Sequence, residues 1–88
     1  MRIERHHSLG REAAKARLES VAQQLSAQFA PNYDWRGDTL DFHGSGIRGK
    51  VDVADDAVLF DVRLGLPLMM MESPIRNAIE NALDKELG

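Results

Sequence analysis

From Tyr33 to Leu64, apolar residues alternate with polar ones, and this period of two constrains the fold more than any other feature. Successive side chains of a β-strand point to opposite faces, so the alternation is typical of strands with one buried and one solvated face. Turn residues interrupt the run at Gly37-Asp38, Ser45-Gly46 and Asp55-Asp56. The pattern therefore predicts an antiparallel meander of four strands whose single apolar face must be covered.

Two segments with helical spacing flank this run. In residues 10–29 apolar residues recur on one helical face, and the opposite face, which includes Lys15 and Glu19, needs only water. The second helix is predicted to start with Ser73 as its N-cap and Pro74 at its first helical position. The two helices are the available cover for the sheet.

Residues 2–8 are expected to form a short first strand ahead of the first helix. The resulting order predicts an α+β fold, β-α-β-β-β-β-α, with an antiparallel sheet and two helices packed on one face. We expect a single domain over residues 1–88, because the chain contains no internal repeat and no long linker.

Composition narrows the class of protein further. A net charge of −3 without long lysine or arginine runs makes nucleic acid an unexpected partner. The chain contains no cysteine, which excludes disulfides and thiolate metal sites and fits a cytoplasmic location. The longest near-continuous apolar run, Leu64–Met71, is far shorter than the roughly 20 residues that cross a bilayer, so we expect no membrane span.

Gly44, Gly46 and Gly49 have the spacing of the dinucleotide-binding fingerprint. That motif acts where it ends a strand and opens a helix, because the first amides of the helix hold the pyrophosphate. Here the residues that follow alternate and predict a strand. We therefore interpret the three glycines as turn and bulge residues and expect no cofactor.

The histidines do not have the spacing of a metal site. His6 and His7 are adjacent in the predicted first strand and would point to opposite faces, and His43 is remote in sequence. His7 shares the parity of Ile3, which predicts a place at the edge of the core with a hydrogen bond to backbone. We expect no metal.

Carboxylates are numerous, but no nucleophile and base occur together, and no segment predicts the enclosed pocket that shifts a catalytic pKa. We therefore expect a protein that is not an enzyme. The charged residues of the strands alternate outward, and we expect cross-strand ion pairs among Asp41, Asp52, Asp61, Arg48, Lys50 and Arg63.

Two apolar groups are candidates for binding. Uncharged residues between the last strand and the last helix could form an adaptable contact surface, and some of them are expected to remain exposed: Leu66, Leu68, Met69, Met70 and Met71. Three aromatic residues are candidates for the core or for a ligand groove: Trp35, Phe42 and Phe60. We expect Trp35 to be buried against both helices.

Several strings along nearly the whole chain are specific enough to compare with a known family. In order they are His7-Ser-Leu9, Glu12-Ala13, Trp35-x-Gly37-Asp38-x-Leu40-x-Phe42, Gly46-x-x-Gly49-x-Val51 and the closing Ile75, Ile79 and Leu83-Asp84. They resemble the small polyhydroxyalkanoic acid system proteins. The resemblance implies association with bacterial genes for making, storing and using polyhydroxyalkanoate and, for some members, with the granule surface. It implies no catalytic residues.

These observations lead to a ranked expectation. The first is a non-enzymatic accessory protein of polyhydroxyalkanoate storage that binds an apolar protein or the granule surface, in the cytoplasm, with a homodimer as its favoured state. The second is a small carrier of hydrophobic acyl ligands with a groove near Trp35, by analogy with polyketide-cyclase-like proteins. A hydrolase or isomerase of hydroxyacyl units is a third class, without a set of residues to support it. A cavity of roughly 300 Å³ or more would favour the carrier.

Overall fold

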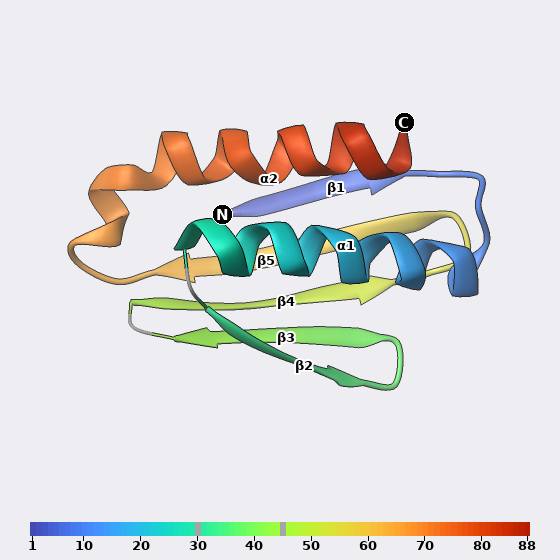
Figure 1. Cartoon of the computed structure of the whole chain (residues 1–88), viewed down its shortest axis with the longest axis horizontal. Coiled ribbons are helices and arrows are strands. Elements are labelled where there is room, and N and C mark those ends of the chain that lie inside the picture. The colour runs from blue at the N-terminus through green and yellow to red at the C-terminus, as the bar shows by residue number, and fades with distance from the viewer. Residues whose placement is uncertain (30, 45) are drawn as a thin grey trace.

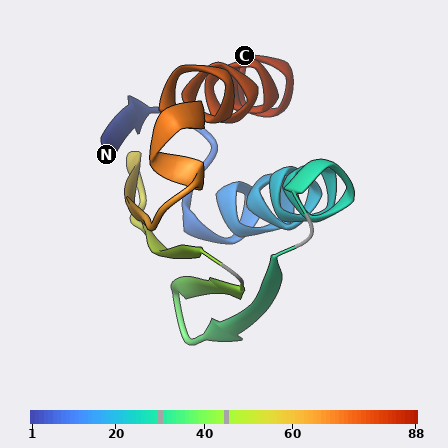
Figure 2. The same ribbon diagram turned by 90° about the vertical axis from the view of Figure 1, so that its left-hand side faces the viewer.

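The computed structural model describes residues 1–29, 31–44 and 46–88, which form a five-stranded antiparallel sheet with two helices on one face (Figures 1 and 2). The predicted α+β class and element order are confirmed. The elements are β1 (Arg2–His6), α1 (Arg11–Phe29), β2 (Asn32–Arg36), β3 (Thr39–Gly44), β4 (Ile47–Val53), β5 (Ala57–Leu64), the 3₁₀ helix η1 (Leu68–Met71) and α2 (Glu72–Leu87).

The strands lie in the order β1-β5-β4-β3-β2. Strands β2 to β5 form the predicted meander, and β1 adds to its far side by pairing with β5, with Ile3 opposite Phe60. Gly37 adopts a φ of +63° in the two-residue turn between β2 and β3, a conformation that glycine allows without steric strain. The predicted Ser45-Gly46 turn falls partly on Ser45, which lies outside the described residues.

The core lies between the sheet and the helices. Figure 2 shows the sheet curving around the two helices, so that both pack against its concave side. Because each strand alternates, only every second residue enters this layer. The largest fully buried side chains come from both helices and from the three central strands: Leu18, Val21, Leu40, Val51, Val58, Phe60, Ile75 and Leu83.

The start of α2 differs from the prediction. The helix begins at Glu72 and continues directly from η1, so Ser73 is already inside it. The backbone amide of Glu72 donates to the carbonyl of Met69, so the preceding turn takes the place of a side-chain cap. Pro74 fits in the first turn, because the amide that proline lacks has no intrahelical partner there.

Candidate functional site

The segment Leu66–Met71, here called the apolar segment, carries most of the exposed large apolar side chains. It connects β5 to α2 at the end of the molecule that faces the viewer in Figure 2. The exposed fractions are 78% for Leu66, 58% for Met69, 85% for Met70 and 44% for Met71. The expectation that part of this segment remains exposed is confirmed.

Leu68 is the anchor of the apolar segment. It is partly buried against the core, which separates it from the four exposed candidates. A 3₁₀ helix has about three residues per turn, so when Leu68 points inward the next two residues point outward. The segment is also tied to the β3–β4 turn, because the Gly65 amide donates to the Gly46 carbonyl at 2.8 Å. A Cβ on Gly46 would lie 3.3 Å from Leu68 Cδ1, so the leucine packs closely on this glycine.

The three aromatic candidates have different environments. Phe42 and Phe60 are buried in the core, with exposed fractions of 6% and 1%. Trp35 is only partly buried, on the edge strand β2. Its indole Nε1 donates to Glu19 Oε1 at 2.9 Å, and the Lys15 ammonium lies 5.4 Å from the ring centroid. Both partners belong to α1, and α2 lies across the sheet near β1 (Figure 1), so the expected contact of Trp35 with both helices is wrong.

Glu19 bonds to the edge strand β2, although the helical pattern placed it on the face that contacts only water. Its carboxylate also accepts a hydrogen bond from the Tyr33 hydroxyl at 2.6 Å. The hydrogen bonds from Tyr33 and Trp35 lower the pKa of Glu19 below its usual 4.5. The same bond from Tyr33 to the carboxylate raises the pKa of Tyr33 above 10.0. This cluster fastens α1 to the edge strand, and it offers no room for a substrate between the bonded groups.

The interior holds no space for an acyl ligand among the described residues. A gap of about 20 Å³ lies between the helices and the sheet, lined by apolar side chains that include Phe29, Phe42 and Phe60. A ligand pocket measures roughly 300 Å³ or more. This gap is far below that volume, and Trp35 does not line it, so it gives no support to the carrier hypothesis.

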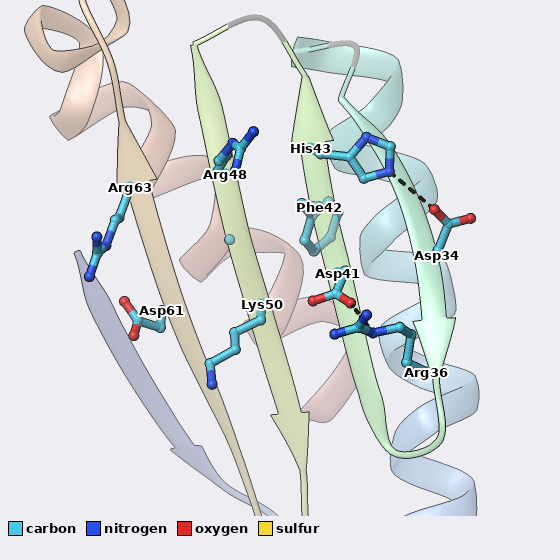
Figure 3. A pocket seen from close by; sticks show the side chains of 10 residues that line it. Asp34, Arg36, Asp41, Phe42, His43, Arg48, Lys50, Asp61 and Arg63 are labelled. Carbon is cyan, nitrogen blue, oxygen red and sulfur yellow. Dashed lines mark hydrogen bonds and ion pairs between the residues drawn. The ribbon is translucent and has the colours of Figure 1, made fainter.

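The outer face of the sheet is a broad, open hollow of about 690 Å³ lined by charged residues (Figure 3). Arg36 pairs with Asp41 at 2.9 Å, and His43 lies 3.1 Å from Asp34. The expected cross-strand ion pairs are wrong within the described residues, because Asp41 pairs with Arg36 from outside the predicted set and Lys50 approaches Asp52 on its own strand at 3.9 Å. The remaining members of the predicted network, Arg48, Arg63 and Asp61, form no ion pair within the described residues.

His7 has the structural role that its position predicted. Its Nδ1 accepts from the Leu9 amide at 3.2 Å, and its Nε2 lies 3.2 Å from the Ala54 carbonyl oxygen. Because Nδ1 acts as acceptor, the proton on the ring belongs to Nε2, which donates to Ala54. The imidazole therefore ties the β1–α1 connection to the β4–β5 turn. No cluster of three or more metal-ligating side chains occurs in residues 1–29, 31–44 and 46–88.

The glycine triplet leads from one strand into another and not into a helix, as predicted: Gly44 ends β3 and Gly49 lies inside β4. Gly46 lies in the turn with a φ of +80°, and β4 begins at the next residue. Gly49 is neither a turn nor a bulge residue, because it pairs regularly with Val62 inside β4. A Cβ there would lie 3.0 Å from the Asp61 carbonyl oxygen and 3.1 Å from Val62 Cγ2, so close strand packing explains this glycine.

Fold and surface together define a small α+β protein that presents an exposed apolar segment beside a charged sheet face. A family model described as "putative polyhydroxyalkanoic acid system protein" matches residues 1–87. The chain belongs to this family, as the motifs around Trp35 predicted. No match to this chain was found among curated proteins or among solved structures. Within the described residues, no helix is both long and apolar enough to span a membrane.

Proposed function

We propose that this protein is a non-enzymatic accessory component of polyhydroxyalkanoate storage that docks on the granule surface in the cytoplasm. Family membership supports the polyhydroxyalkanoate context. The observation that carries the docking role is the exposure of Leu66, Met69, Met70 and Met71 together at one end of the molecule. Exposed apolar side chains gathered in one place are typical of interaction sites.

The chemistry of the apolar segment suits an irregular apolar surface. Methionine is unbranched and polarizable, so its side chain adapts to a partner without a fixed shape. No charged residue interrupts the chain between Arg63 and Glu72. The backbone is held in place by Leu68, and the three methionines are therefore presented without the need to order a loop on binding.

The test is co-sedimentation with protein-free polyhydroxyalkanoate particles. Replacing Met69, Met70 and Met71 together with Gln should weaken binding at least about tenfold, because burial of each methionine contributes roughly 1–2 kcal/mol. Circular dichroism should stay unchanged. The matched control is Leu9→Gln, an exposed apolar residue in the β1–α1 connection, which should bind like the wild type.

Two results would contradict the docking role. If the triple variant unfolds, the methionines belong to the core. If it stays folded and binds polymer particles as the wild type does, the partner surface lies elsewhere, with the outer face around Asp41, Arg48 and Arg63 as the next candidate.

A homodimer is the other occupant that the apolar segment favours, because a second copy could cover the same side chains. Sedimentation equilibrium separates the two cases. A dimer that the methionine-to-glutamine variant dissociates, in a protein that does not bind polymer particles, would assign the segment to self-association.

A further inference from the structure

Two arginines without an acidic partner lie side by side on the outer face of the sheet. Arg48 on β4 is directly opposite Arg63 on β5 in the strand register. Figure 3 shows both side chains at the same end of that face. Like charges directly opposite each other in a sheet are destabilising. Both side chains are exposed, and no carboxylate of the described residues forms an ion pair with either one.

One acidic residue lies close to this pair, and Figure 3 shows its carboxylate, that of Asp61, near the Arg63 guanidinium. Asp61, two residues before Arg63 on β5, is directly opposite Lys50 in the register. The row that contains Arg48 and Arg63 continues to His43 on β3 and holds no carboxylate in the described strands. Neither guanidinium group is held in an ion pair within the described residues, so both are accessible to a ligand, with Asp61 as a nearby opposing charge.

This arginine pair borders the apolar segment. A surface hollow of about 320 Å³ is lined by Arg48, Arg63, Leu64 and the glycines of the adjoining turns. A second hollow of about 340 Å³ joins Arg63 and Leu64 to Met69. Glu72 is the carboxylate in the lining of that second hollow. Apolar and cationic side chains thus form one continuous end of the molecule.

From this juxtaposition we infer that the end of the molecule formed by Arg48, Arg63 and the apolar segment binds a lipid layer that carries anionic headgroups. The inference rests on the apolar docking proposed above, and it adds that the surface to which the protein docks is negatively charged. An apolar segment that enters the boundary between headgroups and acyl chains brings neighbouring cations to the level of the phosphates. Arginine is suited to this position, because its planar guanidinium binds phosphate through two parallel hydrogen bonds.

The net charge of −3 does not oppose this mode of binding at cellular ionic strength. Charges more than about 10 Å apart in 0.1 M salt are largely screened, so the groups nearest the surface dominate. Those groups are the two arginines and the Met1 ammonium, with Glu72 and Asp61 as the nearby opposing charges.

The experiment measures flotation with vesicles of phosphatidylcholine, alone or mixed with phosphatidylglycerol, next to binding of bare polyhydroxyalkanoate particles. The wild type should prefer phosphatidylglycerol. Arg48→Gln with Arg63→Gln should weaken that binding about 30-fold, because each cation near an anionic surface contributes a factor of about five. Glu72→Gln should tighten it. The double variant should bind bare polymer particles like the wild type and keep its circular dichroism spectrum.

The matched control is Arg36→Gln with Lys85→Gln, which also removes two positive charges but at positions far from the apolar segment. An equal loss in this control would show a bulk charge effect and would overturn the inference. A wild type that binds bare polymer without preferring phosphatidylglycerol would also overturn it and leave the docking role intact. Arginine-dependent binding to anionic vesicles without any binding to polymer would support the inference and contradict the polymer-docking role.

Discussion

The Trp35 indole donates a hydrogen bond to the Glu19 carboxylate at 2.9 Å and so joins an edge strand to a helix. Tyr33, two residues earlier on the same face of β2, donates to the other carboxylate oxygen. Two neighbours on one strand face therefore share one acceptor group. Strand β2 is bonded on one side only, to β3, so this cluster is its main additional attachment within the described residues.

Replacing Glu19 with Gln should destabilise the protein by about 1–2 kcal/mol, because one of the two oxygens becomes an NH₂ group that cannot accept from Tyr33 or Trp35. Urea unfolding followed by Trp35 fluorescence measures the change, since the chain has one tryptophan. Glu80→Gln, which removes an exposed partner of Arg76 on α2, should change the free energy of unfolding by less than about 0.5 kcal/mol. Equal effects in both variants would show that the cluster does not hold β2.

Acid should weaken the fold through the same carboxylate. The pKa of Glu19 is lower in the folded state than in the unfolded chain, so its contribution is complete above the unfolded value near 4.5. That contribution is lost as the pH falls through the folded value. Urea midpoints measured from neutral pH downward should therefore fall less steeply in Glu19→Gln than in the wild type. Parallel curves for the two proteins would contradict this assignment.

Tyr33 offers an independent optical readout, because it is the only tyrosine in the chain. Its pKa is raised above 10.0 by the bond to Glu19, so tyrosinate absorbance should appear at higher pH than in the unfolded chain. The stability linked to this raised pKa is present below the unfolded value and is lost as the pH rises through the folded value. In Glu19→Gln the absorbance titration should move back toward lower pH. An unchanged titration would remove Glu19 as the cause.

Gly49→Ala should destabilise the sheet by about 1–3 kcal/mol, because the added methyl overlaps backbone that a strand pair cannot move apart. The contact at 3.0 Å is with the carbonyl oxygen of Asp61, which is fixed by its own strand. Gly65→Ala is the control, since its nearest neighbour would be Gly46 Cα at 3.7 Å, an ordinary contact. Thermal melts of the two variants should separate clearly, and equal melting temperatures would contradict close packing at Gly49.

Local sequence patterns predicted the helices and strands, but they could not predict which strands distant in sequence pair with each other. The turn at Gly37-Asp38 was readable because its residue types are favoured in turns and because the apolar alternation resumes on the same face after it. The pairing partner of β1 could not be predicted from the sequence, because nothing within Arg2–His6 specifies pairing with a strand more than fifty residues later.

The same limit applied to side-chain pairs. Alternation placed Arg48 and Arg63 on the outer face but could not show that the register sets them opposite each other. Glu19 was assigned to a solvated helix face, since helical periodicity cannot show that the edge strand curls back toward that face. The exposure of the methionines was predicted as a class, whereas the inward turn of Leu68 depended on the 3₁₀ geometry of η1.

The pairing of β1 with β5 also determines when the sheet can be completed. The backbone carbonyl of Met1 accepts from the Val62 amide at 2.8 Å, so residues at the first strand bond to residues of the last strand of the sheet. Because β1 precedes β5 in the chain, it stays unpaired during synthesis until β5 has left the ribosome. Closing so long a loop opposes folding entropically, and topologies of high contact order fold slowly. The β2–β5 meander, built from adjacent hairpins, can assemble earlier as the template on which the first strand later docks.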